Sequence, residues 1–143
     1  MTAMVNPANI AAVMGLRRKV RSLGDLSNAV RDGLPKSALK ASVTKVFPEG
    51  SEHTEMLYRI IPEATYKRRR ELLKIDESEK TERLARVIAT AEHVWDDNDE
   101  AKRFLISPHS QLEGQRPIDV ALTELVSRRV EELLWKLFYG IAA

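Results

Sequence analysis

Four successive cations, Lys67-Arg68-Arg69-Arg70, form the densest cluster of chemically active side chains in the sequence. Ammonium and guanidinium groups bind phosphate, so a basic run on a short helix is a candidate for contact with nucleic acid. At about 100° per residue, Lys67 and Arg68 lie opposite Tyr66, whereas Arg69 falls near the buried side, where we expect a structural role. Nucleic-acid contacts are predicted for Lys67, Arg68, Arg70 and Lys74. The alternative is a solvated basic face, which is the usual role of a charge run.

The residues before this run place it on the second helix of a helix-turn-helix. Pro48-Glu49-Gly50 breaks the chain, and Ser51 can cap a short helix over about 52–59. Ile60-Ile61-Pro62 then forms a tight joint, and Pro62 suits the first turn of the next helix. In a helix-turn-helix, the N-terminal part of the second helix enters the major groove of DNA.

The sequence shows no arrangement typical of catalysis or of metal binding. It has no cysteine, which excludes disulfides and thiolate sites. The three histidines, His53, His93 and His109, stand without a paired ligand at metal spacing. Asp96–Glu100 is acidic but lacks the glycine and the alternating ligands of a calcium loop. Because a glycine-rich phosphate loop and a serine elbow are also missing, we expect no enzyme activity, no metal and no cofactor.

The segment 127–143 predicts a helix with two faces that both need a neighbour. Apolar residues recur at helical spacing at Val126, Val130, Leu133, Leu134, Leu137 and Phe138. Trp135 lies about 180° from Val126 on the wheel, and Tyr139 follows one turn later. The apolar stripe is expected to meet the core. Trp135 is expected either to meet a partner protein or to pack on Trp95 or Phe104 within the chain.

Charge divides the chain of 143 residues into two halves. Residues 1–75 hold 14 Lys+Arg and 7 Asp+Glu, and residues 76–143 hold 9 and 14, so the net charges are +7 and −5 and sum to +2. The halves are therefore expected to have different partners, a polyanion being the natural one for the basic half. The absence of an apolar run of about 18 residues, of a signal-peptide pattern and of cysteine predicts a cytoplasmic protein without a membrane segment.

Every predicted element is a helix, so the predicted fold class is all-α. The remaining helices are expected over about 10–23, 25–32, 36–47, 76–95 and 100–106, and from Pro117 through a short helix into the last one. Asp76 as the N-cap and Glu79 at N3 are predicted to form a capping box at the start of the long helix. The junction near 74–77 divides the chain into predicted domains 1–75 and 76–143.

Several segments, in their order, resemble the Xre/MbcA/ParS antitoxins. They are Ile61–Arg70, Asp76–Glu79, Glu82–Val87, Trp95–Ala101, Phe104-Leu105, Gly114–Asp119, Arg129–Leu134 and Leu137–Ile141. No single segment is diagnostic, but the ordered set is specific and covers the chain from about Leu34 to its end.

The resemblance implies an antitoxin encoded beside a RES-domain toxin, an enzyme that consumes NAD⁺ or uses it for ADP-ribosylation. It implies an Xre-like domain, 1–75, that forms a homodimer and binds operator DNA, and a domain, 76–143, that binds the toxin and shields its NAD⁺ cleft. The implied DNA contacts are Thr65, Lys67, Arg68 and Arg70. The implied toxin contacts run from Trp135 to Ala143 and include Phe138, Tyr139, Gly140, Ile141 and Ala142.

Two other functions fit the same sequence. The first is a free-standing transcriptional regulator whose acidic half dimerises or senses a ligand. The second is a protein-interaction module whose helix-turn-helix no longer touches DNA. A toxin encoded in the neighbouring reading frame would distinguish an antitoxin from the first function. The second is tested by the salt dependence of DNA binding, because lysine and arginine contacts with phosphate make affinity fall steeply with salt.

Overall fold

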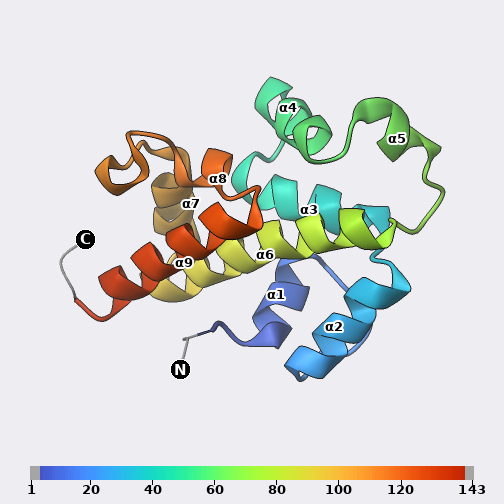
Figure 1. Ribbon diagram of the computed structural model, residues 1–143, viewed down its shortest axis with the longest axis horizontal. Coiled ribbons are helices and arrows are strands. Elements are labelled where there is room, and N and C mark those ends of the chain that lie inside the picture. The colour runs from blue at the N-terminus through green and yellow to red at the C-terminus, as the bar shows by residue number, and fades with distance from the viewer. Residues whose placement is uncertain (1–3, 141–143) are drawn as a thin grey trace.

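The computed structural model describes residues 4–140, and this part of the chain consists of helices and their connections, without a strand. Its elements, in order, are α1 (Pro7–Val13), α2 (Leu23–Asp32), α3 (Lys36–Val46), α4 (Ser51–Ile60), α5 (Glu63–Arg68), α6 (Ile75–Trp95), α7 (Asn98–Ile106), a 3₁₀ turn η1 (Ser110–Leu112), α8 (Pro117–Val120) and α9 (Glu124–Phe138). The predicted all-α class is confirmed (Figure 1).

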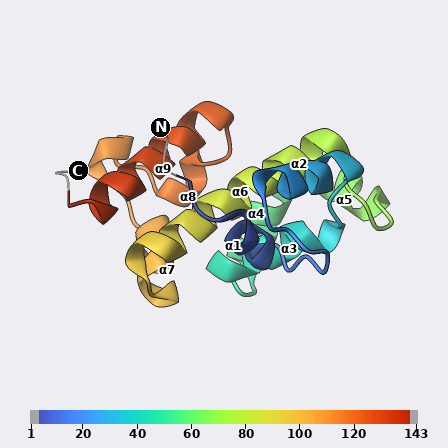
Figure 2. The ribbon, with the colours of Figure 1, turned by 90° about the horizontal axis from the view of Figure 1, so that it is seen from below.

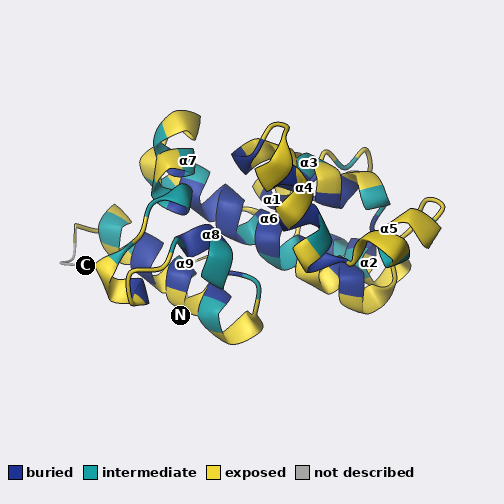
Figure 3. Cartoon of the chain, turned by 90° about the horizontal axis from the view of Figure 1, so that it is seen from above, coloured by how far each residue is buried: buried dark blue, intermediate teal, exposed yellow. Residues whose placement is uncertain are grey.

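The long helix α6 is the centre of the fold. Its 21 residues span about 30 Å. It packs against α1, α2, α3 and α4 from the first part of the chain and against α7 and α9 from the second (Figures 1 and 2). Between Leu84 and Ala91, every residue except Arg86 is buried, because helices cover α6 on several sides (Figure 3).

Both halves of the chain contribute to the apolar core around α6. Leu39 and Met56 come from the first half, and Leu105 and Leu134 from the second. The predicted junction near 74–77 coincides with the start of α6, which then packs on helices from both sides of the junction. The division into domains 1–75 and 76–143 stays a prediction about independent folding.

The first predicted helix, over about 10–23, is wrong in length. α1 ends at Val13, and Gly15 then adopts a left-handed φ of 63°, which turns the chain into a connection that reaches Ser22. The Ser22 hydroxyl accepts a hydrogen bond from the Asp25 amide at 3.1 Å and starts α2. The basic residues that fall within the predicted helix, Arg17, Arg18, Lys19 and Arg21, therefore lie on this connection.

Two predicted helix caps are also wrong. Gly50 precedes α4 with a φ of 105°, and Ser51 is already helical and makes no capping bond. Lys74, rather than Asp76, precedes α6. The capping carboxylate is that of Glu77, which accepts a hydrogen bond from the Lys74 amide at 2.9 Å.

Candidate functional site

The predicted DNA-contact residues gather on and just after α5, at one end of the molecule (Figure 1). None of the residues of α5 is buried. The side chains of Lys67, Arg68, Arg70 and Lys74 are exposed, and Thr65 is half-buried. The turn before α5 is set by Pro62, whose carbonyl accepts a hydrogen bond from the Tyr66 amide at 2.9 Å. The structure therefore presents a short basic helix to solvent, as the helix-turn-helix pattern requires.

Lys67 is engaged in an ion pair on the exposed face of α5. Its ammonium lies 2.6 Å from a Glu63 oxygen, and this hydrogen bond raises the pKa of Lys67. Both side chains are mostly exposed, so the pair is weak and a phosphate group can replace the carboxylate.

Arg69 has the structural role that its place on the helical wheel predicts. Its guanidinium donates two hydrogen bonds of 2.8 Å, from Nε and Nη2, to the two carboxylate oxygens of Glu77. The Arg69 side chain is 16% exposed and that of Glu77 only 9%, so neither is available to a ligand. This pair joins the end of α5 to the first turn of α6.

Lys36, at the start of α3, holds the other side of α5. Its ammonium donates to the carbonyl of Tyr66 at 2.8 Å and to that of Arg69 at 3.0 Å. The same ammonium lies 4.2 Å from the centroid of the Tyr66 ring, within the range of a cation–π interaction. Sequence reasoning missed Lys36, because a lysine in the first turn of a helix carries no signal of a contact 30 residues away.

A short backbone pairing fixes the connection between α5 and α6. The Lys36 amide donates to the Glu71 carbonyl, and the Leu73 amide donates to the Leu34 carbonyl, both at 2.8 Å. Gly33 makes this close approach possible, since its φ is 95° and a Cβ there would lie 2.8 Å from the Leu73 carbonyl oxygen. The basic residues at 67–70 are therefore positioned by contacts with the segment 33–36.

The predicted partner-contact residues gather at the other end of the molecule, where α9 ends (Figure 1). Trp135, Phe138 and Tyr139 pack with one another and with His93 of α6, and we call these four side chains the aromatic surface. Its ring centroids are separated by 5.5 Å for Trp135–Phe138, 5.2 Å for Phe138–Tyr139, 6.2 Å for Trp135–Tyr139 and 5.5 Å for His93–Trp135. Gly140 is exposed, and Ile141, Ala142 and Ala143 lie outside the described residues.

The apolar stripe of α9 is buried in its middle and exposed at its end. Val130, Leu133 and Leu134 are buried, which confirms that α9 contributes to the core. The spacing predicted Phe138 as a core residue, and this is wrong, because its side chain is 46% exposed. The reason is its position on the last turn of the helix, where it meets the exposed ring of His93 at 5.3 Å.

Trp135 does not pack on Trp95 or Phe104, which were its expected partners within the chain. Those two rings pair with each other, with centroids 6.1 Å apart. Trp135 is half-buried and stacks on Tyr139 instead. Its contact with His93 is the one that sequence reasoning missed, because His93 showed no pairing pattern of its own.

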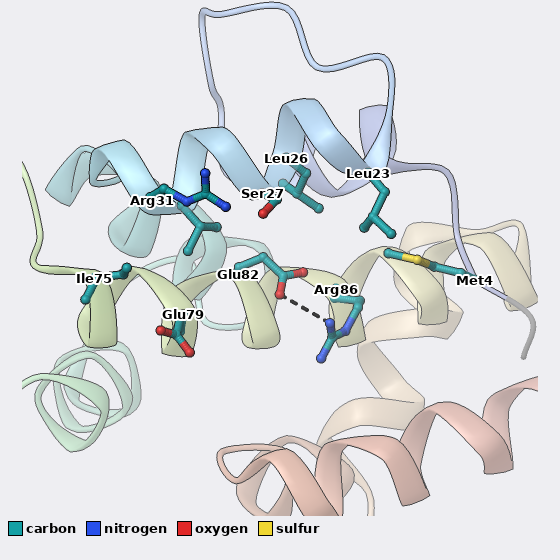
Figure 4. Close-up of a pocket in the computed structure, with 10 residues that line it drawn as sticks. Met4, Leu23, Leu26, Ser27, Arg31, Ile75, Glu79, Glu82 and Arg86 are labelled. Carbon is teal, nitrogen blue, oxygen red and sulfur yellow. Dashed lines mark hydrogen bonds and ion pairs between the residues drawn. The ribbon is translucent and has the colours of Figure 1, made fainter.

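An ion-pair cluster with little exposure to solvent attaches α9 to α6. Arg86 lies 3.3 Å from Glu82 on its own helix and 3.0 Å from Glu131 of α9. Burial raises the pKa of both carboxyl groups, since little solvent reaches them. Glu82 and Arg86 also line a pocket of about 350 Å³ between α2 and α6, whose other walls include Leu23, Leu26 and Ile75 (Figure 4).

Within residues 4–140, no group of three or more His, Asp or Glu side chains gathers closely enough to hold a metal ion. None of the helices in this part of the chain is long and apolar enough to cross a membrane.

Comparison with known proteins finds a similarity for the end of the molecule that bears the aromatic surface. Residues 90–140 match the family model of the antitoxin Xre/MbcA/ParS C-terminal toxin-binding domain. The C-terminal part of the chain is thus similar to the toxin-binding domains of Xre/MbcA/ParS antitoxins. The match extends to Gly140, so the matched region includes Trp135, Phe138 and Tyr139, whereas α5 lies outside it.

A curated relative supports the same family. It is the antitoxin Xre of Pseudomonas putida (strain KT2440), which is 35% identical over 85 residues, or 57% of this chain and 54% of the relative. The aligned region thus spans about half the length of this curated relative. The resemblance to the Xre/MbcA/ParS antitoxins is confirmed by these two similarities.

Proposed function

We propose that this protein is the antitoxin of a toxin–antitoxin pair and that it inhibits its toxin by binding, without a reaction of its own. The observation that carries the proposal is the match of residues 90–140 to a toxin-binding domain whose last helix ends in exposed aromatic rings. The resemblance to the family favours a RES-domain enzyme that consumes NAD⁺ as the toxin.

The aromatic surface is suited to bind a second protein. Phe138 and Tyr139 are 46% and 63% exposed, although large apolar side chains are normally buried. Their rings already rest on one another and on Trp135, so little conformational entropy is lost when a partner covers them. In the proposed complex these rings contact the toxin, and the tail from Gly140 to Ala143 shields the NAD⁺ cleft.

We also propose that α5 binds operator DNA, so that the protein represses its own operon as a homodimer. The exposed cations at 67, 68, 70 and 74 support this role, as does the basic net charge of the first half of the chain. In this proposal, the N-terminal part of α5, with Thr65, faces the major groove, and Arg70 and Lys74 contact phosphates.

Co-expression with the neighbouring gene tests the proposal. We expect the toxin alone to deplete cellular NAD⁺ and arrest growth, and the full chain to restore both and to co-purify with the toxin. A chain that ends at Tyr139 tests the tail, and Leu125→Ala, at an exposed position in the first turn of α9, is the matched control. Continued NAD⁺ loss in the presence of the full chain would contradict inhibition.

A free-standing transcriptional regulator is the alternative function, and the exposed basic helix α5 supports it equally well. An operator-binding protein whose neighbouring frame encodes no toxin, and which co-purifies with none, would be this regulator.

A further inference from the structure

A second basic surface lies beside α5 and is not part of the predicted helix-turn-helix. A groove of about 510 Å³ is lined by the connection after α1, the start of α3 and the link between α5 and α6. The charged side chains that line it are Arg17, Arg18, Lys36, Arg70 and Glu71. Three segments that are distant in sequence thus bring four cations to one groove.

The balance of charge in this groove favours an anion. Arg17 and Arg70 are exposed. Arg18 pairs with Asp32 at 3.1 Å, but both side chains are about half exposed or more, at 47% and 63%, so solvent weakens the pair. Glu71 contributes one negative charge to the lining of the groove. The ammonium of Lys36 already donates hydrogen bonds to backbone carbonyls, so Arg17, Arg18 and Arg70 are the cations that can bind an anion.

The basic surface continues along α3. A second groove, of about 460 Å³, shares Gly15 and Ser37 with the first and is also lined by Lys40 and Lys45. Lys45 pairs with Glu92 at 3.2 Å, whereas Lys40 is exposed. The cations therefore follow a strip that begins at Arg70, directly after α5, and passes the α1–α2 connection.

The connection that bears Arg17 and Arg18 is held in place by the fold. The Leu16 amide donates to the Ala11 carbonyl at 3.1 Å, and Gly15 supplies the left-handed turn with a φ of 63°. The exposed pair of Arg18 with Asp32 adds little to this positioning. Arg17 and Arg18 thus lie at a fixed place beside the start of α3.

We propose that Arg17 and Arg18, together with Arg70, bind backbone phosphates of the DNA duplex that α5 contacts. This inference rests on the proposed operator binding and extends it to a segment outside the family match. The strip adjoins α5 through Arg70, so a duplex seated on α5 brings phosphates to the groove at its side. Arginine forks match phosphate geometry, and two such contacts add affinity without reading sequence.

The test compares three double variants with equal loss of charge, measured by fluorescence anisotropy with DNA from upstream of the gene. They are Arg17→Ala with Arg18→Ala, Lys67→Ala with Arg68→Ala, and the control Lys102→Ala with Arg103→Ala on α7. For the first variant, we expect the slope of log affinity against log salt to become shallower by about 1.8, and affinity at 0.1 M salt to fall by about 10- to 50-fold. The control should leave both unchanged.

A further variant that is expected to bind DNA more tightly separates an effect on binding from a loss of folding. Asp32→Asn removes the carboxylate that pairs with Arg18, and we expect affinity for the same DNA to rise by about two- to ten-fold, which unfolding cannot produce. Weaker or equal binding by this variant would overturn the proposal.

The remaining outcomes separate the groove from the operator proposal. If the Lys67/Arg68 variant loses affinity while the Arg17/Arg18 variant keeps its affinity and its salt slope, the groove is not a DNA contact, and the proposed role of α5 stands. If the unaltered chain does not bind DNA at low salt, the operator proposal fails and this inference fails with it.

Discussion

The guanidinium of Arg69 and the carboxylate of Glu77 face each other in a bidentate ion pair, with both hydrogen bonds at 2.8 Å. Glu77 also accepts the Lys74 amide at 2.9 Å, so one carboxylate fixes the end of α5 and caps the start of α6. The orientation of the proposed DNA-binding helix therefore depends on a side chain that lies on a different helix.

This pair predicts a specific loss of stability in acid. Arg69 lowers the pKa of Glu77 below its ordinary value of 4.5, so the carboxylate form stabilises the fold above about pH 4.5, and the contribution disappears as pH falls through the lowered pKa. We expect Glu77→Gln to lower the melting temperature at pH 7 and the difference from the unaltered protein to shrink by pH 3. Circular dichroism melts at both pH values measure this, and an equal difference at both would refute the role of the charge.

Arg86 predicts a loss of stability that also becomes smaller in acid, although here the pKa values of the carboxyl groups are raised rather than lowered. In Arg86→Ala, the carboxyl groups of Glu82 and Glu131 lose the cation that lies between them, and we expect the free energy of unfolding to fall by about 2–4 kcal/mol at pH 7. Their pKa values are raised by burial, so they take up protons in the folded state as pH falls, and the deficit should become smaller at pH 5.

Urea denaturation of Arg86→Ala at the two pH values measures this deficit. Arg103→Ala is the control, because Arg103 is 67% exposed in its pair with Glu100, and its loss should cost less than about 0.5 kcal/mol. A deficit that grows toward pH 5 would contradict the assignment.

Gly33 predicts an effect of backbone geometry alone. In Gly33→Ala, a methyl group meets the Leu73 carbonyl oxygen at 2.8 Å with a φ of 95°, and we expect destabilisation by about 1–3 kcal/mol. Gly24→Ala is the matched control, since Gly24 lies in the first turn of α2 and a Cβ there would lie 3.6 Å from its nearest neighbour, the Ser22 hydroxyl oxygen. This change should stabilise the protein by about 0.5–1 kcal/mol. Thermal melts of both variants test the difference in sign.

The aromatic surface predicts a loss of toxin affinity without a loss of fold. For Tyr139→Ala, we expect affinity for the purified toxin to fall by about 30-fold or more, the usual effect of removing an aromatic anchor. Its 63% exposure implies little change in melting temperature. Calorimetric titration with Leu125→Ala as control tests this, and undiminished affinity would remove Tyr139 from the proposed interface.

The helices and their inner faces follow from local patterns. The period of Leu84, Val87, Ile88, Ala91 and Trp95 predicts one buried face of α6. This is confirmed for the first four, whereas Trp95, the last residue of the helix, is 38% exposed. The helical wheel also predicts that Arg69 turns inward. The contacts that position the sites cannot be predicted in this way. Lys36 reaches Tyr66 and His93 reaches Trp135 only because helices distant in sequence pack together, and neither residue has a local signature of that packing.

The helix α6 packs against helices from both halves of the chain, and this limits where the chain can be divided into fragments. A fragment that begins at Thr90, where the family match starts, retains only the last six residues of α6, from 90 to 95, and leaves the buried side of α9 without most of its support. A fragment from residue 76 keeps nearly all of α6 but uncovers the face that α1, α2 and α3 protect. Recombinant production of either fragment is thus expected to give aggregation-prone material, whereas inactivating substitutions in the intact chain allow each surface to be studied alone.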